Sequence, residues 1–109
     1  MSVVSATQNL KIDKVVVVPV AAATYSLLTT DCILAVNYTA TGAVSITIST
    51  TQCVSGRIIE IKDSGGNANA NNITITPQVE TIDGAANLVI CGDYDSVSLY
   101  ADGSNWFIY

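Results

Sequence analysis

The sequence predicts an all-β protein, a jelly-roll-like β-sandwich of about eight short strands. Short runs rich in Val, Ile and Thr follow one another along the chain, and Asp-Gly, Gly-Gly and Asn-Asn turns separate them. No stretch repeats its apolar residues with the period of a helix. Regularly spaced short strands with turn residues between them are typical of sandwiches and barrels.

The first strand is expected within residues 15–20, VVVVPV, where β-branched side chains dominate. Proline has no backbone N–H, so Pro19 confines this strand to the edge of a sheet or marks its end. The residues before it, 1–13, are polar and small. We therefore expect an N-terminal arm with the first strand at residues 1–20, and a single sandwich domain at residues 21–109.

The next strands are predicted from five β-rich segments, of which the last three alternate apolar and polar residues. They are 24–30 (TYSLLTT), 32–38 (CILAVNY), 43–49 (AVSITIS), 56–62 (GRIIEIK) and 72–76 (NITIT). In 43–49, Val and Ile alternate with Ser and Thr, which indicates a half-buried strand whose outer face carries hydroxyl groups. In 56–62, Glu60 and Lys62 lie on the face opposite to Ile59 and Ile61.

The C-terminal strands are expected at 87–91 (NLVIC), 96–101 (SVSLYA) and 105–109 (NWFIY). Turn dipeptides separate them, namely Asp83-Gly84, Gly92-Asp93 and Asp102-Gly103. Asp-Gly favours the type I′ turn, because both central residues of that turn need a positive φ. The last segment is apolar on both faces, so this strand is expected to lie between two packed surfaces.

The composition indicates a domain that buries surface against other chains. Half of its 109 residues are hydrophobic and 12% are charged, so little charge is available to cover a small protein. A surface rich in Ser, Thr and Asn would also explain this composition, but obligate interfaces are apolar and we favour an obligate oligomer. The net charge of −5 disfavours binding to nucleic acid or to anionic membranes.

The apolar run at residues 15–23 is too short to cross a bilayer. A signal peptide is disfavoured because Asp13 lies in the segment that should be basic and Pro19 interrupts the apolar run. We expect an unprocessed protein that is made in the cytoplasm.

Catalytic and cofactor chemistry find little support in the residues. The chain contains no histidine to act as a general base near neutral pH, and no G-x-S-x-G nucleophile motif is present. Cys32, Cys53 and Cys91 have neither the even count of a disulfide framework nor a CxxC pattern. We expect no enzymatic activity, no cofactor and buried free thiols, although one pair could be bridged in an oxidising environment.

Three aspartates near the last hairpin form a weak candidate metal site. Asp93, Asp95 and Asp102 carry the hard oxygen ligands that Ca²⁺ prefers. They lack the remaining pattern of a calcium loop, and capping of turns explains them equally well.

Five aromatic residues in the C-terminal part are candidates for a contact surface: Tyr94, Tyr100, Trp106, Phe107 and Tyr109. They could form a platform that stacks on sugar rings, as at a receptor-binding tip. They could instead form the core and the contacts between subunits, since aromatic side chains dominate such interfaces. We favour the subunit interface.

The order of motifs in the second half resembles a β-rich module of tailed-phage structural proteins, which include head decoration and head fibre proteins, tail fibres and spikes. The resemblance covers about residues 24–109 and rests on four motifs in order: Ile61-Lys62-Asp63 with Gly66; Asn71–Ile75 with Pro77; Ile82-Asp83-Gly84; and Tyr94, Ser96, Leu99, Asp102-Gly103 and Trp106. It implies a trimeric viral structural protein, without enzymatic activity in the module itself.

With no long shaft before the module, the resemblance favours a short knob on the capsid surface. We therefore expect a cement protein that binds the outer capsid of the virion as a homotrimer and docks on the capsid protein through Val15, Val16, Val17 and Val18, by addition of a strand. The alternative is a receptor-binding tip of a fibre or spike that recognises a surface glycan. A third class is a calcium-dependent, lectin-like domain.

Overall fold

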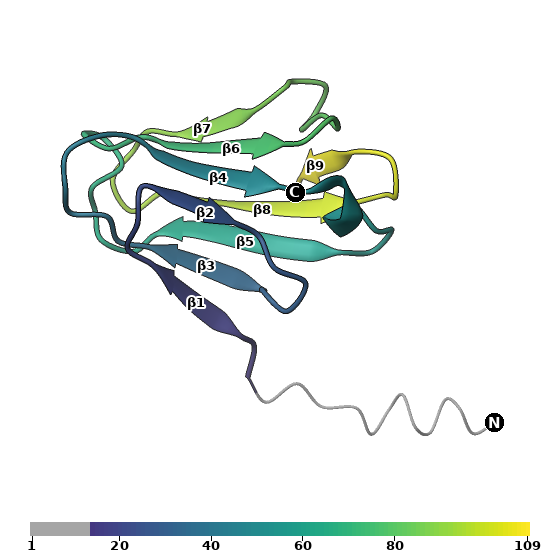
Figure 1. Ribbon diagram of the computed structural model, residues 1–109, viewed down its shortest axis with the longest axis horizontal. Helices are drawn as coiled ribbons and strands as arrows, with labels where there is room; N and C mark the ends of the chain where they lie inside the picture. Colours follow the sequence, from purple (N-terminus) through teal and green to yellow (C-terminus); the bar gives the residue numbers. More distant parts are fainter. Residues whose placement is uncertain (1–13) are drawn as a thin grey trace.

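The computed structural model of the protein describes residues 14–109 and shows an all-β fold of two sheets (Figure 1). The strands in these residues are β1 (Val17–Val20), β2 (Thr24–Ser26), β3 (Ile33–Val36), β4 (Val44–Ile48), β5 (Ile58–Asp63), β6 (Ile73–Pro77), β7 (Leu88–Ile90), β8 (Ser96–Ala101) and β9 (Trp106–Ile108). A single 3-10 turn, Thr50–Gln52, is the one helical element among them. Each segment expected to form a strand contains one, so the all-β class is confirmed.

The chain alternates between the two sheets from β1 to β6. The five-stranded sheet has the order β1-β3-β5-β8-β9, and the four-stranded sheet has the order β2-β4-β6-β7. In Figure 1, β1 and β3 point to the left, whereas β4 and β6 point to the right. When the chain comes back to a sheet, the new strand pairs in parallel with the previous strand of that sheet. One strand from each sheet therefore forms one turn of a coil, and three such turns are stacked: β1–β2, β3–β4 and β5–β6.

This connectivity differs from the jelly roll that the sequence led us to expect. A jelly roll pairs its strands antiparallel, whereas the pairs β1–β3, β3–β5, β2–β4 and β4–β6 are parallel. The first six strands instead form a short two-sheet solenoid, in which each turn contacts its neighbours. Short alternating strands are expected in a jelly roll and in a solenoid alike. The alternation shows which residues face inward, but it does not show which strands pair.

The last three strands complete the sheets in antiparallel orientation. β7 pairs with β6, β8 pairs with β5, and β9 pairs with β8. The turn before β7 has the predicted geometry, because Asp83 and Gly84 have φ values of 49° and 84°. The flanking residues Ile82 and Ala85 exchange two backbone hydrogen bonds of 2.8 and 2.9 Å.

The turn between β8 and β9 is built differently from the expected type I′ turn. Gly103 has a φ of 96°, whereas Asp102 is not among the residues with positive φ. The Asp102 carboxylate instead accepts hydrogen bonds from the backbone N–H groups of Ser104 at 2.8 Å and Asn105 at 2.9 Å. The side chain therefore closes this turn.

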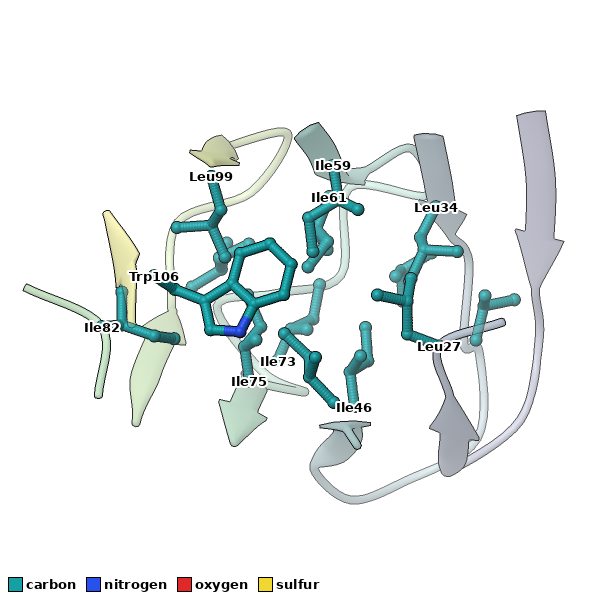
Figure 2. Close-up of a cluster of buried hydrophobic side chains, with 14 of the residues drawn as sticks. Leu27, Leu34, Ile46, Ile59, Ile61, Ile73, Ile75, Ile82, Leu99 and Trp106 are labelled. Atoms are coloured by element: carbon teal, nitrogen blue, oxygen red, sulfur yellow. The ribbon is translucent and has the colours of Figure 1, made fainter. Parts of the chain in front are cut away.

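The core lies between the two sheets and is built from the inward residues of nearly every strand (Figure 2). Its isoleucines follow the predicted alternation: Ile46 and Ile48 in β4, Ile59 and Ile61 in β5, and Ile73 and Ile75 in β6. Trp106 is fully buried and lies among these side chains from both sheets. Burial of each large apolar side chain contributes about 1.5–3 kcal/mol to folding, so this double layer is the main source of stability.

A buried carboxylate and an arginine hold the loops that precede β3 and β5. The Asp31 carboxylate accepts hydrogen bonds from the Tyr25 hydroxyl at 2.7 Å and from Leu28 N at 2.8 Å. Burial and the adjacent Asp31 raise the pKa of Tyr25 to about 12. The Arg57 guanidinium donates to the backbone oxygens of Leu28, Thr29 and Asp31 at 3.0, 2.6 and 2.7 Å. These contacts fix the β2–β3 loop on the start of β5.

A second buried carboxylate holds the loops that follow β5 and β7. Asp63, the last residue of β5, accepts hydrogen bonds from Ala68 N and from Tyr94 N, both at 2.9 Å. Burial alone would raise the pKa of Asp63, but backbone N–H groups of Tyr94, Ala68, Asn67 and Gly66 hold it below its ordinary range. The β5–β6 and β7–β8 loops are thereby joined through one side chain.

Candidate interaction surface

The outer face of the five-stranded sheet carries a group of stacked aromatic rings. Ile58 of β5, Tyr100 of β8 and Phe107 of β9 are cross-strand neighbours in one row. The rings of Tyr100 and Phe107 stack with centroids 5.4 Å apart, and Tyr109 meets Tyr100 edge-on at 5.8 Å. We name these four residues, Ile58, Tyr100, Phe107 and Tyr109, the aromatic face.

The aromatic face is accessible to a partner. Ile58, Tyr100 and Tyr109 expose 55%, 40% and 64% of their surface, and Phe107 is half-buried. Contiguous apolar surface of this kind marks interaction sites on soluble proteins. Tyrosine suits such a site, because its ring is apolar while its hydroxyl finds a hydrogen-bond partner in a contact.

The structure divides the five predicted interface residues into three groups. Tyr100, Phe107 and Tyr109 come together in the aromatic face. Trp106 is 0% exposed and so lies in the chain's own core, where it cannot touch another chain. Tyr94 lies in the turn before β8, whereas Tyr100 is near the end of that strand, and the Tyr94 ring is 6.0 Å from the Lys62 ammonium.

The residues expected to dock on a partner lie at the edge of the five-stranded sheet. β1 is the edge strand, as Pro19 predicted, and it pairs with β3 alone among the strands of residues 14–109. Val15, Val16 and Val17 are about half exposed and Val18 packs against the core. The last seven residues of the expected arm, 14–20, thus run into the sheet, whereas residues 1–13 lie outside the part that the structure describes.

The three candidate calcium ligands do not come together. Asp93 and Asp95 precede β8 and Asp102 follows it, so a strand of six residues separates them. Asp102 caps its turn, and hydrogen bonds from Asn105 and Ser104 lower its pKa. Asp93 accepts a hydrogen bond from Asn69 N at 2.8 Å. Within residues 14–109, no group of three or more potential ligands is arranged to hold a metal ion.

The three cysteines are free thiols, but their burial differs. Cys53 is buried, Cys32 is intermediate and Cys91 is exposed. Burial, together with the negative charges of Glu80 and Asp102, raises the pKa of the Cys53 thiol. The expectation of buried free thiols therefore describes Cys53 and does not describe Cys91.

The outer face of the four-stranded sheet has the opposite character. Two rows of hydroxyl side chains cross its parallel strands, Thr24, Ser45 and Thr74 in one row and Ser26, Thr47 and Thr76 in the other. We name these six residues the hydroxyl face. The alternation in 43–49 predicted one strand of this face. The rows become visible with the register, which aligns Thr-Tyr-Ser, Ser-Ile-Thr and Thr-Ile-Thr across three strands.

Comparison with protein-family models gives no match to this chain, and no curated protein matches its sequence. Among the described residues, no helix is long and apolar enough to cross a membrane.

Proposed function

We propose that this chain is a non-enzymatic structural protein of a virion, a decoration or cement protein that binds the outer capsid as a homotrimer and stabilises it. The observation that carries the proposal is the aromatic face, an exposed apolar surface on a small protein with few charges. The order of motifs that resembles phage structural modules supports the viral setting.

The trimer contact is assigned to the aromatic face. Interface energy concentrates in a few large aromatic side chains that lose their contact with water. Tyr100 and Tyr109 fit this role because both rings are exposed and already packed against one another. Little conformational entropy is then lost when they meet a second subunit.

The capsid contact is assigned to the edge of β1. An edge strand offers unpaired backbone groups to which an extended segment of another protein can add. The exposed Val15 and Val17 would flank such an added strand with apolar surface. Because the chain would bind the assembled capsid and not its free subunits, binding would stabilise the assembled state by mass action.

The trimer is tested by size-exclusion chromatography with light scattering. We expect three times the 11.4 kDa mass of one chain at micromolar concentration, and a shift towards monomer for Tyr100→Ala and Tyr109→Ala. Tyr94→Ala is the matched control, since it removes an exposed tyrosine outside the aromatic face and should leave the trimer intact. A wild-type monomer at micromolar concentration would refute the assembly.

The capsid role is tested separately by copy number on virions. A cement protein co-purifies with capsids in numbers like those of the capsid protein, and Val17→Lys should reduce this number without changing the trimer. A few copies per particle, located at the tail, would instead favour the receptor-binding tip. In that second function the exposed Tyr100 ring would stack on a glycan, and Tyr100→Ala would abolish glycan binding while the trimer persisted.

A further inference from the structure

An open groove lies on the four-stranded sheet, at the carboxyl ends of three parallel strands. Strands β2, β4 and β6 end together at Ser26, Ile48 and Pro77, on the right of Figure 1 for β4 and β6. The groove has a volume of ≈ 340 Å³, which lies within the range of small-molecule sites. It is lined by Ser26, Thr47, Ile48, Ser49, Thr76, Pro77 and Gln78, and we name it the hydroxyl groove.

The lining combines neutral hydrogen-bonding groups with an exposed surface that is mostly apolar. Four of the seven lining residues carry hydroxyls and one carries an amide, whereas Ile48 and Pro77 border the groove but are themselves buried. None of the seven is ionisable at neutral pH. The groove therefore offers no charged side chain to an ion, and it suits a neutral ligand with hydroxyl groups and C–H faces.

The hydroxyl groups keep hydrogen-bonding capacity for a ligand. The Ser26 and Thr47 hydroxyls bond to each other at 3.0 Å, which uses one of the three hydrogen-bonding positions of each. The Gln78 side-chain oxygen accepts from Thr50 N at 3.1 Å, and this contact fixes the amide at the rim. Its NH₂ group has two donors that are oriented by the same contact.

Regular strand spacing arranges these groups in a row. Ser26, Thr47 and Thr76 are cross-strand neighbours, and adjacent strands lie about 4.8 Å apart. The row therefore extends over about 10 Å, which is on the scale of two linked sugar rings. A row on three strands is also rigid, so binding requires little ordering of side chains.

We propose that the hydroxyl groove binds a neutral oligosaccharide, with Thr47 and Thr76 as its central hydrogen-bonding residues. This site lies on the outer side of the four-stranded sheet, whereas the aromatic face lies on the outer side of the five-stranded sheet. A trimer that buries the aromatic face therefore leaves the groove open. The proposal does not depend on the assembly or on its capsid partner.

The test is a titration of the ¹⁵N-labelled full chain with neutral trisaccharides, followed by amide NMR shifts. The panel contains trisaccharides of β-linked glucose, β-linked N-acetylglucosamine, α-linked glucose and α-linked mannose. We expect at least one of them to shift the amides of the groove residues. Thr47→Val and Thr76→Val, which keep the side-chain shape and remove the hydroxyl, should each weaken this binding at least fivefold.

Two controls make the outcome specific. Thr24→Val removes a hydroxyl of the same face outside the groove and should leave the affinity unchanged, and thermal melting verifies that all variants fold. The proposal is overturned if no trisaccharide shifts the groove amides at 20-fold molar excess or above, as an order-of-magnitude limit on a weak site. It is also overturned if Tyr100→Ala abolishes binding and Thr47→Val does not, which would place the sugar on the aromatic face.

Discussion

The buried carboxylate of Asp63 holds two loops together, the β5–β6 loop and the β7–β8 loop. It is 1% exposed and accepts hydrogen bonds from backbone N–H groups of two loops, at Ala68 and Tyr94. These donors lower its pKa although burial opposes them. Because the folded state holds the proton less tightly than the unfolded state, the stabilisation by Asp63 is present above the ordinary aspartate pKa and is lost as the pH falls through the lowered value.

We expect Asp63→Asn to destabilise the protein at pH 7 by about 1.5–3 kcal/mol, the range for hydrogen bonds to a charged group. The difference between wild type and variant should be smaller at about pH 3 than at pH 7, since the unfolded wild type then takes up a proton that the folded state resists. Urea unfolding at both pH values measures this difference in the free energy of unfolding. A difference that stays constant with pH would show that the charge of Asp63 contributes nothing.

The three thiols should react at widely different rates. Cys91 is exposed, whereas Cys53 is buried and has a raised pKa, so little Cys53 thiolate is available to attack a reagent. In variants that keep one cysteine each, a disulfide reagent at pH 8 should modify Cys91 at least tenfold faster than Cys53. In 6 M guanidinium the two rates should converge. Equal rates in the folded protein would mean that Cys53 opens to solvent.

At the scale of a single strand, β1 has a free edge, and Pro19 limits how far another strand can pair with it. Ile33 N donates to Val16 O and Asn37 N donates to Val20 O, so the even-numbered residues of β1 face β3. Val17 and Pro19 therefore direct their backbone groups to the free edge. The missing N–H of Pro19 falls on that edge, which shortens the stretch that another strand can pair with.

Pro19→Val should restore the N–H and promote pairing between edges. We expect assemblies larger than those of wild type, which grow with protein concentration in light scattering. Adding Val17→Lys to this variant should reverse the effect, because a charged side chain on an edge opposes the approach of a second edge. If Pro19→Val kept the mass of wild type at all concentrations, the proline would have no role in limiting this edge.

The elements that the sequence predicted are those determined by local chemistry. The alternation in 43–49 identified Ile46 and Ile48 as inward-facing, and the Asp83-Gly84 turn has the expected positive φ values. Strand pairing could not be predicted, because parallel and antiparallel neighbours share the same period. The position of Trp106 was ambiguous for a related reason: β9 is apolar on both faces, and pairing with β8 decides which face is the core. The rows of the hydroxyl face likewise required a register across three strands.

For the molecule as a whole, the two-layer core should make the three solenoid turns and the C-terminal strands one cooperative unit. Repeat proteins unfold in parts when contacts are limited to adjacent repeats. Here Trp106 packs on side chains of both sheets, and its backbone bonds the 81–83 segment through Trp106 N to Thr81 O and Asp83 N to Trp106 O. Loss of the last strand therefore disturbs both layers.

We expect the urea transitions followed by Trp106 fluorescence and by far-UV circular dichroism to coincide. Trp106→Ala should cost about 3–5 kcal/mol, as for other large aromatic residues removed from a core. Trp106→Phe should cost clearly less, because the indole N–H finds no acceptor among the described residues and its removal relieves an unsatisfied buried donor. A fluorescence transition that precedes the dichroism transition would show instead that the C-terminal strands unfold separately from the solenoid.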